Sequence, residues 1–270
     1  MGIVTWASLR CELLPSVQEP FVVGSSRLEP LLEMAEWLIR LRMVTECFVL
    51  SGTDLAAMFS EQGSAGLQRL KAGLPSWTLF YAVAGYEYFP EERVSVSIKD
   101  ITTLTQRLGL EPAKSVGGLS AADILKAVQR PSSEPYWKLR HKGACEDVFF
   151  LATNSKIEEL VSTMDFLAYE AGYPVSDRGV YVQPTVQGTS CHCEFNLFYD
   201  PADPGETQRV RTLASTATKT LMDKGAFFSR PYGEKALMIM NRDAASVGAL
   251  KKLKQIFDPN EVMNPGKLCF

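Results

Sequence analysis

The stretch from Cys191 to Tyr199 alternates between apolar and polar side chains, and no other feature restricts the possible folds of this chain as much. Successive side chains of a strand point to opposite faces of its sheet, so the alternation places the apolar residues on one face and the polar residues on the other. The first set is Cys191, Cys193, Phe195 and Leu197, and the second is His192, Glu194 and Asn196. The sequence therefore predicts a sheet with one face packed on a core and one polar face.

Further strands and helices alternate along the rest of the chain. Apolar spacing predicts helices over about 27–42, 53–61, 64–71, 90–108, 121–129, 155–172, 203–225 and 243–257. Alternation or short apolar runs predict strands over about 3–10, 47–50, 77–84, 147–152 and 180–186, in addition to 191–199. Ser155 and Glu158 have the spacing of a capping box. We find no internal repeat, and the order of elements predicts an α+β fold, with helices covering a mainly antiparallel sheet.

Composition narrows the class of protein. The 270 residues include 46% hydrophobic and 22% charged residues, enough for a sizeable core in one large domain or two small ones. A net charge of -3 argues against nucleic-acid binding, which needs a basic surface. No apolar run reaches the roughly 20 residues of a membrane span, so we expect no membrane insertion. The N-terminus lacks a signal peptide, and the six cysteines are dispersed, which predicts free thiols and a cytoplasmic location.

Three stretches carry a resemblance to a known family. They are Gly2–Arg10 (GIVTWASLR), Gly188–Phe195 (GTSCHCEF) and Leu253–Leu268 (LKQIFDPNEVMNPGKL). They resemble the C-terminal half of FAD-linked oxidases of the vanillyl-alcohol oxidase and p-cresol methylhydroxylase type, and the last stretch is the most specific. The resemblance implies a ferredoxin-like cap domain and FAD as the cofactor.

The resemblance also implies a division of the chain. Residues 1–14 would be a strand leading out of an FAD-binding domain, 15–224 the substrate cap, and 225–270 a segment that returns to that domain. Family members carry an N-terminal FAD-binding domain of roughly two hundred residues, a usual domain size. Because this sequence starts where that domain normally finishes, we expect another chain to supply it, or the gene to be split or truncated.

Two groups of candidate catalytic residues follow from the resemblance. His192 and Glu194 would form the floor of the flavin pocket and polarise or deprotonate the substrate, since a histidine titrates near neutrality. The alternative is that they lie on an ordinary solvated sheet face. Arg230 would hold an anionic substrate or stabilise the reduced flavin, and Tyr232 would share a proton with a substrate oxygen. The alternative is a surface arginine beside a turn proline.

The two ends of the chain carry the candidate cofactor contacts. Gly2, Ile3, Val4, Asn264 and Lys267 would lie against the flavin by resemblance, and Lys267 would offset negative charge on its reduced ring. A tail packed for stability explains Asn264 and Lys267 equally well. We expect no metal, because the chain has only two histidines and lacks the ligand set of lactate-type relatives.

The function implied by the resemblance is that of the cap and C-terminal part of an FAD-dependent oxidoreductase. Its small-molecule substrate would be an alcohol, a hydroxy acid or a phenolic compound that loses a hydride to the flavin. The partners would be an FAD-binding-domain chain and, in addition, an electron carrier. The alternatives are a non-catalytic interaction subunit that holds a flavoprotein, or a truncated fragment. The segment Tyr136–Lys142 mixes aromatic and cationic side chains, and would be a wall of the pocket, a docking site for a partner, or a solvated loop with one buried tryptophan.

Overall fold

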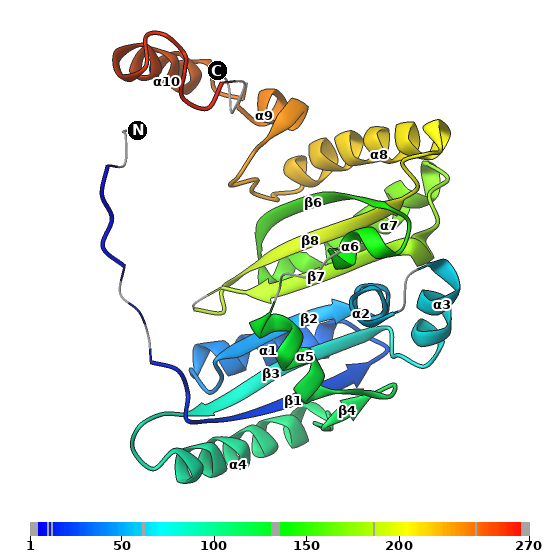
Figure 1. Ribbon diagram of the computed structural model, residues 1–270, viewed down its shortest axis with the longest axis vertical. Coiled ribbons are helices and arrows are strands. Elements are labelled where there is room, and N and C mark those ends of the chain that lie inside the picture. Colours follow the sequence, from blue (N-terminus) through cyan, green and yellow to red (C-terminus); the bar gives the residue numbers. More distant parts are fainter. Residues whose placement is uncertain are drawn as a thin grey trace.

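The computed structural model describes residues 5–9, 11, 13–60, 63–130, 136–185, 187–240 and 242–265. Its centre is a six-stranded sheet in the order β1-β3-β2-β7-β8-β6, in which all neighbouring strands are antiparallel (Figure 1). These strands are β1 (Val17–Ser25), β2 (Glu46–Ser51), β3 (Trp77–Gly85), β6 (Ala144–Thr153), β7 (Arg178–Pro184) and β8 (Ser190–Tyr199). The α+β fold with an antiparallel sheet is therefore confirmed.

The sheet consists of two similar halves. Each half contains a strand, a helix, two strands and a further helix in that order, with two short helices inserted between the second and third strands of the first half. The third strand of each unit pairs between the other two. The halves meet where β2 pairs with β7, with Val49 opposite Val182 and Leu50 opposite Tyr181. The sequence analysis found no repeat, because the two units share a pattern of elements rather than a pattern of residues.

Four long helices cover one face of the whole sheet. They are α1 (Glu29–Arg40), α4 (Pro90–Leu108), α7 (Ile157–Glu170) and α8 (Pro204–Asp223). Their apolar stripes pack on the inward residues of all six strands and form one continuous core that spans both halves. Cys191, Cys193, Phe195 and Leu197 lie in this core, so the predicted apolar face of β8 is confirmed.

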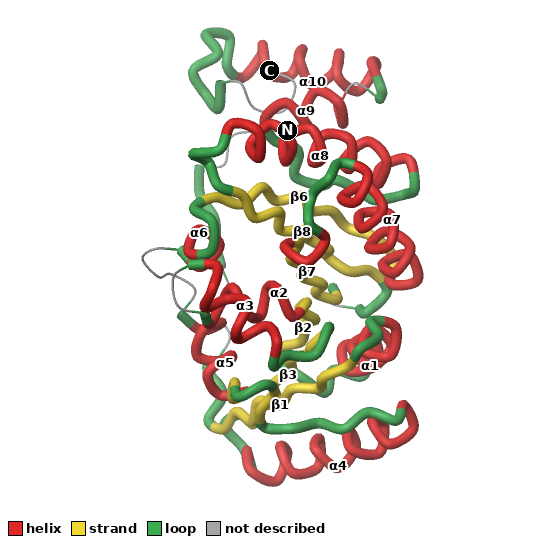
Figure 2. Tube along the Cα trace, turned by 90° about the vertical axis from the view of Figure 1, so that its right-hand side faces the viewer, coloured by secondary structure: helices red, strands yellow, loops and turns green. Residues whose placement is uncertain are grey.

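Shorter elements lie on the opposite face, mostly over the first half (Figure 2). They are α2 (Gly52–Phe59), α3 (Ser64–Ala72), α5 (Ala121–Gln129), α6 (Trp137–Arg140) and the hairpin of β4 (Ser115–Val116) and β5 (Leu119–Ser120). A second core forms there, in which Leu55 of α2 and Ile124 of α5 pack on Phe48 and Phe80 of the sheet. The same face of β8 carries His192 and Glu194, so the second half presents polar groups where the first half presents apolar ones.

The structure differs from the local predictions at several points. Residues 5–9 of the predicted first strand form no strand, and the first strand is instead β1, which the sequence analysis missed. Pro20 is tolerated in β1 because β1 is an edge strand. The capping box does not form, since α7 starts without a side-chain cap and Ser155 lies near Thr153 instead. Helix α9 (Gly233–Met240) was not predicted.

The two ends of the chain extend away from the sheet. The N-terminal segment runs outside the body of the molecule, and Trp6 in it is 81% exposed (Figure 1). At the other end, α9 and α10 (Ala244–Phe257) lie beyond α8. Within the described part of the chain, none of the helices is both long and apolar enough to cross a bilayer.

Candidate active site

The register of β8 with its two neighbours brings residues of three strands to one polar surface. His192 lies opposite Gln183 of β7 and Leu151 of β6, and Glu194 lies opposite Tyr181 of β7. The His192 imidazole stands between two aromatic rings, 5.9 Å from that of Phe149 and 6.0 Å from that of Tyr181. Its Nε2 lies 3.4 Å from an oxygen of Glu194, so the histidine and the carboxylate interact on the sheet face.

Phe149 joins these residues to the segment after α8. Tyr232 stacks on the Phe149 ring, with centroids 5.8 Å apart and planes 18° apart. The guanidinium carbon of Arg230 lies 5.1 Å from the same ring centroid, in a cation–π arrangement. The structure thus brings together all four predicted catalytic residues, His192, Glu194, Arg230 and Tyr232, around one aromatic ring.

A short bridge on the edge strand explains this placement. After α8 the chain returns to the free edge of β6, where the backbone N–H groups of Leu151 and Phe227 each donate to the other's carbonyl at 2.8 Å. Phe228 then packs into the main core, and the next residues turn onto the polar face. Arg230 and Tyr232 follow Phe227 of this bridge by only a few residues. The bridge therefore holds both side chains beside Phe149.

Lys138 of α6 connects the carboxylates of this face. The Lys138 side chain is buried, and its ammonium donates to Asp147 at 2.9 Å and to Glu194. Burial alone would lower the pKa of Lys138, but the two carboxylates together raise it. Burial would raise the pKa of Glu194, yet His192 and Lys138 outweigh it and keep that pKa below its ordinary value. Glu194 is therefore an anion that the site itself holds in place.

Asp147 differs from Glu194 although both bind the same ammonium. Burial raises the pKa of Asp147 above its ordinary value, and Lys138 only partly opposes this. The carbonyl of Asp147 accepts a hydrogen bond of 3.3 Å from the Tyr232 hydroxyl. Burial, followed by the charges of Glu146 and Asp147, raises the pKa of Tyr232 to about 12. Tyr232 is therefore a neutral hydrogen-bond donor near pH 7.

A fully buried carboxyl group, that of Asp54, lies next to this cluster. Asn196 of β8 donates to its Oδ2 at 3.0 Å, and its Oδ1 has no hydrogen-bond partner among the described residues. The carboxyl lies flat on Gly179, where a Cβ would come within 1.8 Å of Oδ1. Burial raises the pKa of Asp54 to about 7, against the opposing effects of Asn196 and Lys138. Glycine at 179 is needed for this contact.

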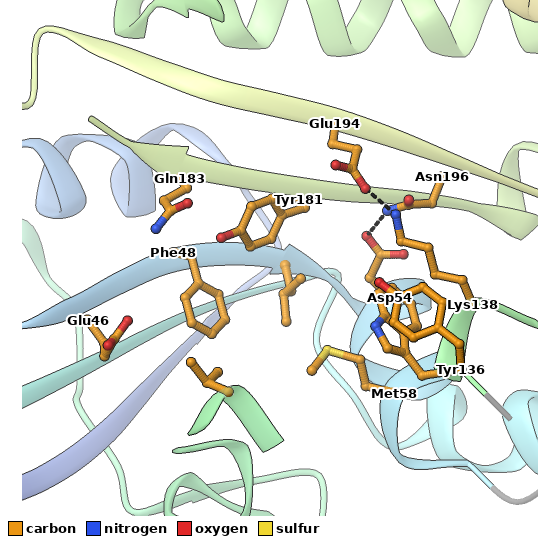
Figure 3. Close-up of a pocket in the computed structure, with 13 residues that line it drawn as sticks. Glu46, Phe48, Asp54, Met58, Tyr136, Lys138, Tyr181, Gln183, Glu194 and Asn196 are labelled. Carbon is orange, nitrogen blue, oxygen red and sulfur yellow. Dashed lines mark hydrogen bonds and ion pairs between the residues drawn. The ribbon is translucent and has the colours of Figure 1, made fainter. Parts of the chain in front are cut away.

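A cavity of about 300 Å³ opens on the same face, between the sheet and helices α2, α5 and α6 (Figure 3). Its polar groups lie at two ends, with Lys138, Glu194 and Asn196 at one end and Glu46 and Gln183 at the other. Aromatic and aliphatic side chains line the cavity between these two ends. The apolar lining residues are Phe48, Leu50, Met58, Val128, Tyr136, Trp137 and Tyr181. Tyr136, Trp137 and Lys138 thus line the cavity, as the first of the three alternatives for this segment predicts.

Of the predicted cofactor contacts, the structure describes only Asn264. Gly2, Ile3, Val4 and Lys267 lie outside the described residues. Asn264 is exposed, has a φ of 49°, and follows α10 in the chain. Its role at a flavin remains a prediction.

Asp147 and Asp54 were not predicted, and Lys138 was singled out only as part of the segment Tyr136–Lys142, without a role of its own. Asp147 begins a predicted strand and Lys138 lies nine residues before it, and no spacing rule links the two. Asp54 lies in the first turn of α2, where an acidic residue is ordinary. The one available signal was Gly179 in a strand, because an interior glycine often marks the close approach of another group.

Comparisons with known proteins bear on the fold of the chain. A family model described as FAD linked oxidases, C-terminal domain, matches residues 188–268. No curated protein sequence matches the chain. Among solved structures, p-cresol methylhydroxylase with substrate bound is similar at 15% identity and a TM-score of 0.76, over 95% of this chain and 53% of the other.

Two further solved structures are similar. The 4-ethylphenol oxidase from Gulosibacter chungangensis, in an isoeugenol complex, has 15% identity and a TM-score of 0.74 over 94% of this chain and 54% of its own. An alkyldihydroxyacetonephosphate synthase has 11% identity and a TM-score of 0.58, over 94% and 45%. At these identities the likeness shows the fold alone, and the chain spans about half the length of these proteins.

Proposed function

Because residues 188–268 match the family model of the C-terminal domain of FAD linked oxidases, we propose that the chain forms the substrate side of an FAD-dependent oxidoreductase. The observation that carries the proposal is the cluster of His192, Glu194, Arg230 and Tyr232 around Phe149 on the face that no long helix covers. The reaction would be removal of a hydride from the carbon of an alcohol, a hydroxy acid or a phenolic compound.

The residues of this face suit one side of a flavin. Phe149 and Tyr232 offer flat apolar surface, and Arg230 supplies a charge that does not titrate. Among the described residues, no carboxylate lies within ion-pair distance of the Arg230 guanidinium, so this charge is available to a ligand. When bound, FAD would supply the hydride acceptor. Arg230 would stabilise the negative charge that the ring system gains on reduction.

The chain's own groups would handle the substrate proton. His192 would accept the proton of a substrate hydroxyl, with its imidazole held on the sheet face 3.4 Å from an oxygen of Glu194. Lys138 keeps the Glu194 carboxylate ionised near neutral pH. Tyr232 would donate a hydrogen bond to a substrate oxygen and exclude water from the same side of Phe149.

The remainder of the FAD site is part of the proposal. An FAD-binding domain, on this or another chain, would cover the face, with residues 1–14 and 225–270 packing on it and 15–224 acting as the cap. Exposed apolar residues in both end segments, such as Leu14 and Ile256, support this assignment. An electron carrier would take the electrons from the flavin. The cytoplasm is the proposed compartment, supported by the five described cysteines, which are free thiols.

A flavin titration tests the proposal. We expect the full chain to change the visible spectrum of FAD saturably, and to bind reduced FAD about tenfold more tightly than oxidised FAD because of Arg230. Arg230→Met should remove the preference for the reduced form. Arg209→Met, at an exposed site on α8, is the matched control and should keep it.

Two outcomes would count against the proposal. A folded chain that leaves both flavin spectra unchanged would favour the non-catalytic subunit or the fragment instead. A saturable titration that Arg230→Met and Arg209→Met affect equally would remove this face from the flavin site. Anaerobic bleaching of FAD by an added alcohol, lost in His192→Ala, would complete the case for hydride removal.

A further inference from the structure

We propose that the strap, residues Tyr136–Lys142, closes the cavity from the side of α6 while His141 is neutral, and is released when His141 takes up a proton. The inference goes beyond the proposed function and depends on neither flavin nor substrate. It is carried by a buried imidazole that has no hydrogen-bond partner in the part of the chain that the structure describes. This imidazole belongs to the segment that forms one wall of the cavity.

Two lysines hold the strap on the body of the molecule. Lys138 binds two carboxylates of the polar face beside the cavity. Lys142, at the other end, binds Asp177 at 3.0 Å and Glu206 at 2.6 Å. The next residue, Gly143, has a φ of 96°, a conformation that glycine adopts without strain. The strap is therefore a short element anchored by charged groups at both ends, and such contacts respond to a change in nearby charge.

The His141 side chain packs between these two anchors and is only 6% exposed. Its ring stands edge-on to that of Phe198, with centroids 5.6 Å apart, and Trp137 of the strap packs on the same Phe198 ring at 6.4 Å. Neither ring nitrogen has a hydrogen-bond partner among the described residues. A neutral imidazole lacks one donor and one acceptor contact there, whereas an imidazolium would bring two unpaired donors and a charge. Protonation thus makes the buried position costly.

The charged groups around His141 do not compensate for an added proton. Those that face it are Lys71 of α3, Lys142 of the strap, Asp177 of the 3₁₀ helix Val175–Asp177 and Glu206 of α8, and Arg140 and the exposed Asp200 line the groove beside it.

Both carboxylates that face the ring, those of Asp177 and Glu206, already bind the Lys142 ammonium. An imidazolium would therefore be a third cation, after Lys71 and Lys142, beside two acids. Burial lowers the pKa of His141 below its ordinary value, and Asp177 opposes this only in part. Release of the strap removes the cost, because the imidazolium then reaches water.

The direction of the pH dependence follows from proton linkage. Between the ordinary imidazole pKa of about 6.5 and the lower pKa of the buried ring, the closed strap binds fewer protons than the released strap. Release therefore becomes more favourable as pH falls below about 6.5, by up to about tenfold in its equilibrium constant for each pH unit. Tyr136 and Lys138 are part of the cavity wall (Figure 3), so the cavity opens in acid and closes at neutral pH.

Hydrogen exchange of the full chain, followed by mass spectrometry at pH 7.5 and pH 5.5, tests the proposal. In the strap, the backbone N–H of Leu139 donates to Tyr136 at 2.8 Å, and that of Gly143 donates to Leu139 at 3.0 Å, so these amides report release. After correction for intrinsic exchange rates, we expect their protection to be about five- to tenfold lower at pH 5.5, while β8 loses none. Unchanged protection of the strap, or an equal loss in β8, would overturn the proposal.

His141→Phe isolates the titrating group. The variant keeps an aromatic ring beside Phe198 and gives up no hydrogen bond that the structure describes. Its strap should be equally protected at both pH values. His192→Gln is the matched control, because the chain has only these two histidines, and it should lose protection of the strap at pH 5.5 like the original chain. A loss that persists in His141→Phe, or that disappears in His192→Gln, would contradict the proposal.

Lys142→Gln provides a second test that does not alter the imidazole. It leaves Asp177 and Glu206 without their lysine, so both carboxylates become available to an imidazolium at His141. Protection of the strap should be lower than in the original chain at pH 7.5, because an anchor is lost, but should no longer fall towards pH 5.5. The same fall with pH as in the original chain would show that the charges around His141 do not control the strap.

Discussion

At the scale of single residues, the site depends on how buried charges are compensated. Lys138 is 8% exposed and neutralises two carboxylates, whereas Asp54 is fully buried and one of its oxygens has no partner in the described part of the chain. A compensated buried ion pair is sensitive to loss of either partner, and an uncompensated carboxyl prefers to hold its proton. The two groups therefore make opposite contributions to the pH dependence of stability.

Asp54 should make the protein less stable as pH rises. Its pKa is raised to about 7, so between the unfolded pKa near 4 and that value the folded state binds more protons than the unfolded state. Stability is therefore lost with increasing pH, by roughly 2 to 3 kcal/mol between pH 5 and pH 8. Asp54→Asn should remove this loss, as measured by urea unfolding at both pH values. The same pH dependence in the variant and the original chain would show that Asp54 does not cause it.

Lys138→Met should destabilise the fold by about 3 kcal/mol at pH 7, because it leaves two partly buried carboxylates without a cation. The pKa of Glu194 lies below its ordinary value, so the stability it provides is present above about pH 4.5 and is lost as pH falls through the folded pKa. The difference between variant and original should therefore shrink below pH 5. Lys156→Met, in an exposed pair with Glu159, is the control and should cost at most about 0.5 kcal/mol. Equal costs for the two variants would contradict the buried network.

At the scale of elements, local patterns identified most helices and strands but not all of their ends. Period and capping predicted α1, α4, α5, α8 and α10 within a few residues, because their apolar stripes are long. β1 was missed because Glu19 and Pro20 interrupt its pattern, and only its pairing with β3 makes it a strand. Residues 5–9 alternate equally well, yet pair with nothing described, so alternation alone does not make a strand.

Helix caps allow a direct test at this scale. Asp203 caps α8, since its Oδ1 accepts from the backbone N–H groups of Gly205 at 2.8 Å and Glu206 at 3.2 Å. Asp203→Ala should cost about 1 kcal/mol in urea unfolding. Ser155→Ala should cost only a few tenths of that, because the capping box suggested by the sequence does not form. A comparable loss in both variants would mean that Ser155 caps α7 after all.

At the scale of the whole molecule, one core holds two halves that pair only through β2 and β7. Val49 and Val182 face each other across this junction and are fully buried in the continuous core. The halves should therefore lose stability together, although each has the elements of a small domain. If so, the chain unfolds as a single cooperative unit rather than as two units that unfold independently.

Val182→Ala tests whether the halves are coupled. The substitution should cost about 2 kcal/mol, as expected for methyl groups removed from a packed core. In native-state hydrogen exchange, protection should fall by the same amount in β3 of the first half and in β8 of the second. Val96→Ala, at a 58% exposed position, should change neither. A loss of protection confined to β8 would show that the halves open independently.

The candidate site was predictable only in part. Alternation in β8 placed His192 and Glu194 on a polar face, and the family resemblance supplied Arg230 and Tyr232. The sequence could not show that Phe149 joins them, or that Lys138 and Asp54 lie beside them, because those contacts depend on pairing between distant strands and on the bridge at Phe227. The alternation within a strand thus predicts on which face of the sheet a residue lies. The order in which the strands pair determines which other residues lie beside it.

The two-fold repetition of the strand–helix–strand–strand–helix unit has a consequence for the mutational tolerance of the chain. On the shorter-helix face, Phe80 of the first unit pairs with Phe48, while Glu194 of the second pairs with Tyr181. In the first unit, side chains on this face pack in a core and stabilise the fold. In the second unit, residues on this face are less constrained by packing. In a saturation mutagenesis map, Phe80 should tolerate few substitutions in any assay of abundance. His192 should tolerate many in that assay and few in an assay of activity, which would mark the second unit as the copy specialised for chemistry.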